Sequence, residues 1–295
     1  MTIKQLAQLS LLFTLSLTGV NAQLIKNQYG EAFTDQPFFN TKEIEENNIK
    51  TIQGCYTHYK LGEGLRKTKL YKAYHFNDKG QLIEQLESFI HEGDIDTIVT
   101  YYKYDSKQNL TSILTRGATE ISQVLLTYDN QNRAVQEERR KLSLLTSEYS
   151  KTTFSATYSK GSNHQRKTIY DAEGKPFKYE DKVFNHEGQV VEVIERLENN
   201  GKGTKTTYFY NDQKLLDSLV KSSLISTEYE ESYSFRYDEN NNLVDKNYYQ
   251  NGEEVQLQKM IYHLEERTLE NVVIHQVSTN LTRILKIEDY IYFDG

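Results

Sequence analysis

The sequence of 295 residues contains one cysteine, two prolines and no tryptophan. The single cysteine, Cys55, cannot form an internal disulfide, so the fold must rest on packing and hydrogen bonds. Scarce proline favours long, fully paired β-ladders, because proline cannot donate to a ladder. Basic residues are outnumbered by acidic ones, which gives a net charge of −7, and the basic residues form no cluster along the sequence. This balance argues against nucleic acid as a partner and against an anionic membrane surface.

Motifs that carry chemistry are absent as well. None of the seven histidines lies four residues from another, and the chain has neither a glycine-rich phosphate loop nor a G-x-S-x-G elbow. Cys55 and His58 fall in one expected strand and point to opposite faces, which does not suit a nucleophile and its base. We therefore expect no catalytic residue, no cofactor-binding residue and no metal site.

Carboxylates are abundant, but they stand in charged runs that are typical of solvated strand faces, such as residues 137–138, 228–231 and 265–266. A carboxylate pair acting on an extracellular polysaccharide stays open as a second hypothesis. The lone Asp residues of the turns described below suit turn capping better than calcium binding, since calcium needs clustered oxygen ligands.

The first 22 residues predict export. Lys4 gives a short positive region, residues 6–20 are mostly apolar and uncharged, and Val20-Asn21-Ala22 forms a signal-peptidase site. The apolar run is too short to be a permanent membrane helix. We expect a periplasmic or secreted mature protein at residues 23–295 that forms a single domain without stable membrane insertion.

What the sequence has in quantity is tyrosine (23 residues) and phenylalanine (12 residues), arranged in a repeat. The unit is an aromatic residue, then Asp or Asn, a polar turn that often holds glycine, and an aliphatic residue. The key aromatics are Phe76, Tyr104, Tyr128, Tyr170, Phe184, Tyr210 and Tyr237, with a degenerate last copy at Tyr262 and a poor copy in the long interval at Tyr158. The turns that follow carry Asp105, Asp129, Asp171 and Asp238, and the turn glycines are Gly80, Gly174 and Gly188.

Each unit predicts a β-hairpin. The Asp or Asn caps the turn backbone, and glycine supplies a positive φ. Steps of 24 to 28 residues between most key aromatics leave room for two strands and two turns. Consecutive hairpins should pair into an antiparallel meander, with the aromatic residues as a ladder on one face and polar residues on the other. The fold class is therefore all-β, a large curved or partly closed sheet.

Tyr-Asp followed by a polar turn, Gly or Asn, and Leu resembles the YD repeat of Rhs-type proteins over about residues 70–270. The overall layout is also similar to small secreted YD-like proteins of Bacteroidetes, most of them without assigned function. YD repeats of toxin-associated proteins build large β-sheet shells. This chain has too few copies to enclose a cargo and shows no toxin or protease segment.

The two ends of the mature chain lack the repeat. Residues 23–53 form a cap segment, in which Asn40 and Glu43 predict a capped short helix and residues 49–53 a first strand. We expect this segment to cover the first sheet edge. Residues 271–295 are richer in aliphatic residues and predict closing strands.

Function follows only coarsely from these features. The ladder is expected to be a packed face; the alternative is an exposed face that binds sugar rings or an extended peptide. The first hypothesis is a non-enzymatic binding or scaffolding protein of the cell envelope, with an envelope protein or glycan as partner. The alternatives are the hydrolase above and an outer-membrane β-barrel, which would need continuously apolar lipid-facing positions.

Overall fold

The computed structural model describes residues 23–263 and 267–294, which form one short helix and eighteen strands. The expected export signal at residues 1–22 lies outside the described residues, as do Glu265 and Glu266. The elements are α1(Thr41–Glu46), β1(Ile49–Lys60), β2(Arg66–Phe76), β3(Leu82–His91), β4(Asp94–Tyr104), β5(Leu110–Arg116), β6(Glu120–Tyr128), β7(Ala134–Ser143), β8(Tyr149–Lys160), β9(His164–Tyr170), β10(Pro176–Phe184), β11(Val190–Leu197), β12(Gly203–Tyr210), β13(Leu216–Ser223), β14(Glu230–Tyr237), β15(Leu243–Gln250), β16(Glu253–Tyr262), β17(Leu269–Gln276) and β18(Leu281–Tyr292).

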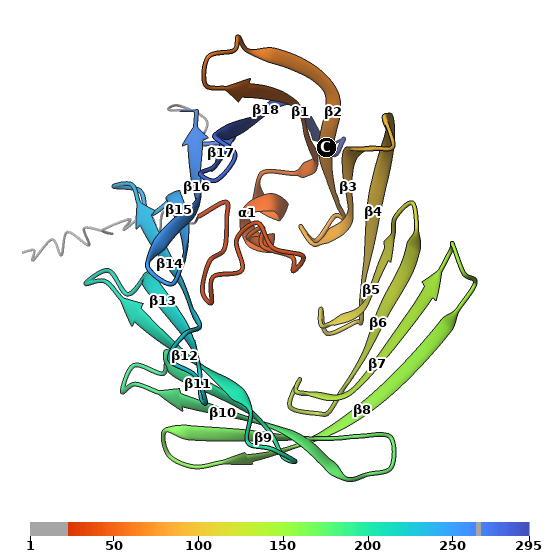
Figure 1. Cartoon of the computed structure of the whole chain (residues 1–295), viewed down its shortest axis with the longest axis vertical. Helices are drawn as coiled ribbons and strands as arrows, with labels where there is room; N and C mark the ends of the chain where they lie inside the picture. Colours follow the sequence, from red (N-terminus) through yellow and green to blue (C-terminus); the bar gives the residue numbers. More distant parts are fainter. Residues whose placement is uncertain (1–22, 264–266, 295) are drawn as a thin grey trace, which may run out of the picture.

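The strands form one antiparallel meander that closes into an 18-stranded barrel (Figure 1). The prediction of an all-β meander is confirmed, whereas a partly closed sheet is wrong. β1 pairs with β2 on one side and with β18 on the other, from Ile49 opposite Tyr292 to Lys60 opposite Leu281. Closure satisfies the backbone groups that two free edges would have exposed.

The N-terminal segment lies inside the ring of strands (Figure 1). We call residues 23–48 the plug. Most of its apolar side chains are buried in one core with side chains of the barrel, and Ile25, Phe38 and Ile44 are fully buried. The expectation that this segment covers a sheet edge is therefore wrong. With no edge left to cover, its apolar residues are buried against the inner face of the barrel instead.

Helix α1 belongs to the plug. Asn40 is its N-cap, and its side-chain oxygen accepts a hydrogen bond from the backbone N–H of Lys42. The helix has only six residues, and a helix this short depends on packing for its stability. That packing includes Ile44, which is fully buried. Among the described residues, no helix is both long and apolar enough to cross a membrane.

Because neighbouring strands are antiparallel, turns alternate between the two ends of the barrel. We call the end that carries the turns after the even-numbered strands the first rim and the opposite end the second rim. Most turns of the repeat lie at the first rim, and each follows a β-bulge at the key aromatic, as between Lys103 and Tyr104. A bulge bends the strand and increases twist, which suits barrel closure.

Candidate functional site

Strand periodicity decides which side chains face the barrel interior. Tyr102 on β4 and Phe235 on β14 are buried in the core that includes the plug, so their parity points inward. On β10, Glu180 and Lys182 line the interior. Because side chains alternate along a strand, Asp181 between them lies on the outer face. The inner faces of β1–β4 and β13–β18 contribute side chains to the core that includes the plug. The inner faces of β7–β12 line the cavities described below.

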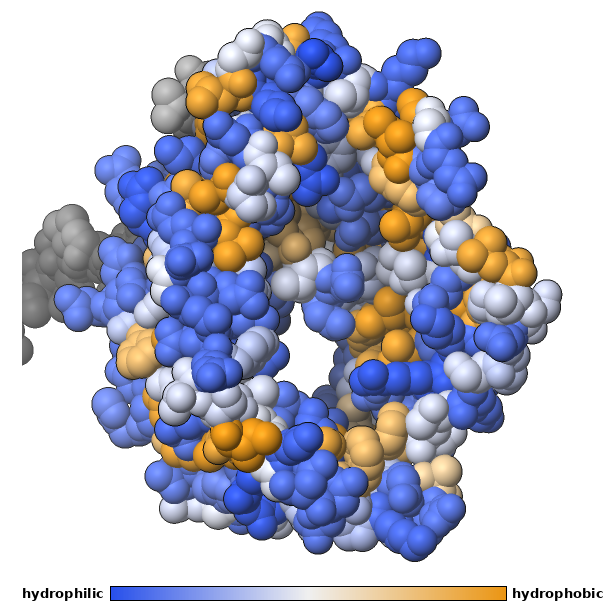
Figure 2. Space-filling model, viewed as in Figure 1, coloured by the Kyte–Doolittle hydropathy of each residue, from blue (hydrophilic) through white to orange (hydrophobic). Residues whose placement is uncertain are grey.

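A cavity of about 610 Å³ lies between the plug and the inner face of β9 to β15. The plug contributes Tyr29, Gly30 and Thr34 to its wall. The barrel contributes aromatic and charged side chains: Glu180, Lys182, Glu195, Tyr208, Lys221, Tyr233 and Lys246. Figure 2 shows an opening through the molecule in the part of the ring that the plug leaves free. The cavity is therefore part of a lumen.

A second cavity of about 260 Å³ continues this lumen along β7 to β10. Its wall includes Lys167 and Lys178, which are the inward positions next to Gln165 and Glu180 of the first cavity. Phe154 and Phe177 form a ring pair there, with centroids 5.4 Å apart. Phe177 is 41% exposed, and both rings line the cavity.

Lys246 joins the barrel to the plug inside the first cavity. Its ammonium donates hydrogen bonds to the backbone oxygens of Ala32 at 2.6 Å and Gly30 at 3.3 Å. It also lies 5.4 Å from the ring centroid of Tyr233, whose ring stacks on Tyr248. Burial lowers the pKa of Lys246 to about 8. The plug loop is thus held by a buried cation.

The two carboxylates of the first cavity stand directly opposite each other, Glu180 on β10 and Glu195 on β11. Each is already bonded to a lysine. Glu195 accepts a hydrogen bond from Lys178, and Glu180 pairs with Lys182 at 3.2 Å. Carboxylates held in this way suit a structural ion-pair row better than proton transfer to a substrate.

Most tyrosines of the repeat donate a hydrogen bond from their hydroxyl to a backbone carbonyl. Tyr104 donates to the carbonyl oxygen of Leu82 at 2.9 Å, and Tyr237 donates to that of Leu216 at 2.9 Å. The same bond joins Tyr128 to Leu110, Tyr158 to Ala134, Tyr210 to Val190, Tyr262 to Leu243 and Tyr290 to Leu269. In each case the acceptor is the residue that begins the return strand of the preceding hairpin. The sequence pattern located all of these tyrosines except Tyr290, which lies in the closing strands, but it did not reveal this bond.

Tyr170 stands apart from the other repeat tyrosines. The turn after it follows β9 and lies at the second rim, so its side chain points outward, where its hydroxyl lies 3.2 Å from Thr157 Oγ1. Tyr158 occupies the equivalent inward position at the first rim. Phe76 is buried and packs on Phe39 of the plug, with ring centroids 5.1 Å apart, while Phe184 lines the first cavity.

The polar residues of the repeat shape its turns. Asp105 Oδ1 accepts from the backbone N–H groups of Lys107 and Asn109, at 2.8 and 2.9 Å. Asp129, Asp171 and Asp238 make the same pair of bonds. Gly80, Gly174 and Gly188 stand three residues after the capping residue and have φ values of 68°, 77° and 81°. These residues terminate strands, and none of them lines either lumen cavity.

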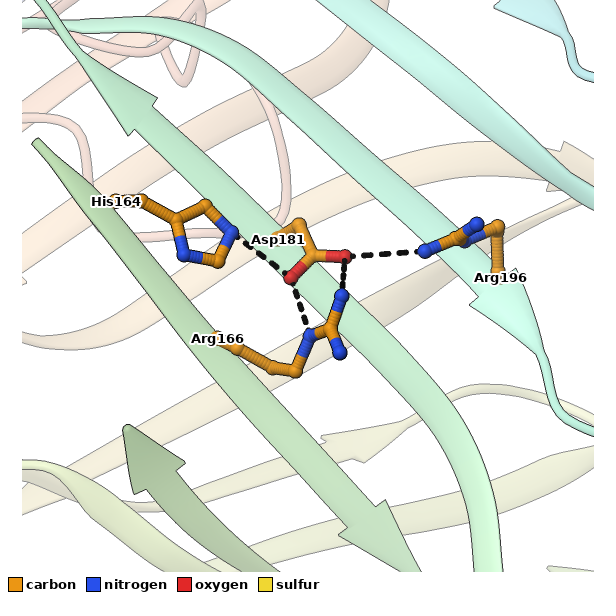
Figure 3. A network of polar contacts seen from close by, with 4 residues as sticks. All are labelled: His164, Arg166, Asp181 and Arg196. Atoms are coloured by element: carbon orange, nitrogen blue, oxygen red, sulfur yellow. Dashed lines mark hydrogen bonds and ion pairs between the residues drawn. The ribbon is translucent and has the colours of Figure 1, made fainter. Parts of the chain in front are cut away.

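A charged network lies on the outer surface of β9 to β11 (Figure 3). Arg166 binds both oxygens of Asp181, at 2.6 and 2.9 Å. His164 lies 3.1 Å from Oδ1, and Arg196 donates to Oδ2 at 3.4 Å. Burial alone would raise the pKa of Asp181, but the hydrogen bonds and charge of Arg166 outweigh it and hold that pKa low. The network ties three strands together in the arc that the plug leaves unsupported.

Cys55 and the histidines show no catalytic arrangement in the described structure. Burial, together with a hydrogen bond to Glu288, raises the pKa of the Cys55 thiol, so the reactive thiolate is disfavoured. Across residues 23–263 and 267–294, no group of three or more His, Cys, Asp or Glu side chains is placed to hold a metal ion.

No family model matches this chain, and no curated protein sequence matches it significantly. Among solved structures, a porin-like protein from Bacteroides uniformis is similar over 81% of this chain and 98% of its own, with 10% identity and a TM-score of 0.40. A porin-like protein from Bacteroides vulgatus gives 82% and 98%, with 12% identity and a TM-score of 0.33. The Photorhabdus luminescens Tc holotoxin pore gives 77% and 14%, with 10% identity and a TM-score of 0.21. At these TM-scores the likeness carries no argument about function.

Proposed function

We propose that the protein is an exported, non-enzymatic binding protein of the cell envelope, whose ligand enters the barrel lumen beside the plug. The observation that carries this proposal is the cavity of about 610 Å³ between the plug and β9 to β15. Its wall combines aromatic rings with charged side chains, the mixture that orients a ligand in a pocket. Export rests on the sequence of residues 1–22.

The inner wall offers a matched pair of positions to test where the ligand binds. Thr206 on β12 lines the cavity, whereas its neighbour Thr207 points to the outer surface. Thr206→Trp should fill the lumen, and Thr207→Trp should leave it open. The mature chain and both variants are incubated with labelled glycan and protein fractions of the envelope, and retained ligand is measured.

We expect the unmodified chain and Thr207→Trp to retain the same ligand and Thr206→Trp to lose it. Equal retention by Thr206→Trp would place binding outside the lumen, and no retention by any of the three would overturn the proposal. Fractionation of cells that make the full chain, with and without residues 1–22, tests export. The full chain should reach the periplasm or medium, and the shortened chain should stay in the cytoplasm.

A polysaccharide hydrolase is the first alternative, with Glu180 and Glu195 as its carboxylate pair. Both face the cavity from neighbouring strands. The lysine partners described above weigh against this alternative. Incubation of the retained glycan with the protein tests it: chain shortening that Glu195→Gln abolishes would favour the enzyme.

An outer-membrane barrel is the second alternative, since closure pairs the backbone groups as a membrane requires. The outer surface weighs against it. Asp181, midway along β10, pairs on the outside with Arg166 of β9, and Lys205 pairs with Glu192 on β12 and β11. A lipid-facing band tolerates such charges poorly at its centre. Detergent dependence and heat-modifiable migration would favour this alternative.

A further inference from the structure

We propose that the ligand of the lumen is an acidic oligosaccharide, an inference that rests on the proposed function. The first observation is charge. The whole chain carries a net charge of −7, yet the walls of the two lumen cavities hold more basic than acidic residues. The basic residues are Arg139, Lys167, Lys178, Lys182, Lys221 and Lys246. The acidic ones are Glu137, Glu180 and Glu195.

Every acidic residue of the wall forms an ion pair with a basic one, and the remaining basic residues have no acid of the wall as an ion-pair partner. Glu137 pairs with Arg139, Glu180 with Lys182, and Glu195 with Lys178. Within the part of the chain that the structure describes, Lys167 makes no ion pair. Glu180 lies opposite it on β10 but pairs with Lys182, and the Lys167 ammonium lies over the ring of Tyr158. Lys221 stands 4.0 Å from the carboxylate of Glu231, at the limit of an ion pair. These two lysines are available to an incoming anion.

The second observation concerns the rings that share this wall. Tyr208 and Tyr233 line the first cavity, and Phe154 and Phe177 line the second. The ring of Tyr233 is fixed by stacking on Tyr248, with centroids 4.9 Å apart. Fixed aromatic surfaces near cations suit a ligand that has both apolar ring faces and carboxylates, which describes a uronic acid chain.

The closed ladder favours a saccharide over an acidic peptide. A peptide that binds by strand addition gains most of its affinity from backbone hydrogen bonds to a free sheet edge. The described strands of the barrel are paired on both sides, so the lumen offers no edge. Recognition must then come from side chains. Aromatic rings can contact the apolar faces of sugar units, and lysines can bind their carboxylates. An acidic oligosaccharide is therefore the ligand class that both observations support.

Calorimetric titration of the mature chain with three matched probes tests this inference. The probes are tetragalacturonate, the neutral maltotetraose and tetraglutamate. Tetragalacturonate should bind best, and added salt should weaken its binding. Lys167→Gln and Lys221→Gln should each weaken it by about tenfold, the loss expected for one charge-assisted contact. Lys167→Arg should retain affinity.

Lys259→Gln, an exposed change on the outer face of β16, is the control and should leave binding unchanged. Thermal melting of each variant excludes loss of fold as the cause. Equal binding of maltotetraose and tetragalacturonate would overturn the acidic ligand while the lumen site stands, and tighter binding of tetraglutamate would overturn the saccharide. If no probe binds, the acidic oligosaccharide is overturned. The proposed function itself falls only on the retention experiment above: if Thr206→Trp retains envelope ligand as well as Thr207→Trp does, or if none of the three chains retains any.

Discussion

At the scale of single residues, the repeat tyrosines do more than fill space. The ladder between β3 and β4 runs from Glu84 opposite Tyr101 to the second rim, and at the first rim the Tyr104 hydroxyl bonds to Leu82 beyond the last paired residues. Burial raises the pKa of Tyr104, as expected for a hydroxyl held away from water. The tyrosine thus joins neighbouring hairpins where their backbone pairing ends.

Tyr104→Phe isolates this hydrogen bond, because it removes only the hydroxyl. It should lower the free energy of unfolding by about 1 kcal/mol, the usual net value of one such bond. Tyr104→Ala should cost about 3 kcal/mol, since it also leaves a cavity. Urea unfolding measures both changes.

Tyr71→Phe is the control, because Tyr71 points outward from β2 and is 37% exposed. It should change the free energy of unfolding by less than about 0.5 kcal/mol. Equal effects of Tyr104→Phe and Tyr71→Phe would show that the hydroxyl bond contributes nothing to stability.

At the scale of elements, one hairpin turn supports the plug while its counterparts stand free. A Cβ atom at Gly80 would lie 1.9 Å from the carbonyl oxygen of Thr41, the first residue of α1. At Gly174 and Gly188 a Cβ atom would meet nothing within 4 Å. The turn between β2 and β3 is therefore shaped for contact with the helix as well as for its own φ.

Gly188→Asn and Gly80→Asn separate these two demands. Asparagine tolerates a positive φ, so Gly188→Asn should cost less than about 1 kcal/mol. Gly80→Asn should cost at least about 2 kcal/mol more, because the side chain overpacks against α1. Chemical unfolding measures the cost, and protease cleavage within residues 23–48 reports whether the plug is displaced. Similar costs at the two positions would contradict the contact between Gly80 and the helix.

The turns were the most predictable elements. Asp or Asn, followed three residues later by a residue with positive φ, is a local signal that needs no knowledge of the rest of the fold. The outward position of Tyr170 at the second rim was not predictable, because no local sequence signal shows which rim a turn occupies. The plug was not predictable either: residues 23–48 have no repeat, and their apolar residues pack on strands from both ends of the chain.

At the scale of the whole molecule, opposed groups shape the dependence of stability on pH. Burial lowers the pKa of Lys246 to about 8, while Glu31 of the plug opposes this shift. In the unfolded chain the lysine keeps its proton up to about pH 10.4. Between these values the unfolded state binds more protons, so the contribution of this lysine to stability rises with pH.

Buried tyrosines act in the opposite direction at higher pH. Burial raises the pKa of Tyr208, Tyr210 and Tyr237 to about 12, against about 10 when unfolded. Their contribution to stability is complete below about pH 10 and is lost as the pH rises to about 12. We therefore expect a maximum of stability near pH 10.

Lys246→Met should remove the rise between about pH 8 and 10 and keep the fall above pH 10. Urea unfolding of both proteins across this range measures the difference. The tyrosine absorbance at alkaline pH should show a group of tyrosines that titrates near pH 12 in the folded protein and near pH 10 in urea. A difference between the two proteins that does not vary with pH would contradict a lowered pKa at Lys246.

Barrel closure and the lumen lay beyond the sequence for related reasons. The repeat predicts hairpins, but it does not predict how many strands complete a ring. Closure also depends on β1 pairing with β18, at the opposite end of the chain. The candidate site depends on parity: alternation shows that Glu180 and Lys182 share a face, but only closure makes that face an interior. The chemistry of the lumen follows from topology.

The pairing of β1 with β18 sets a condition on folding kinetics. Its partners are separated by more than 200 residues, from Lys60 and Leu281 to Ile49 and Tyr292. Contacts between residues so far apart in the sequence are slow to form, because a very long loop must close first. Until β18 has formed and paired, β1 has an unpaired edge and the plug lacks strands that bury it. The chain needs protection from aggregation over that interval, and pairing of its last strand is the step that completes the native barrel.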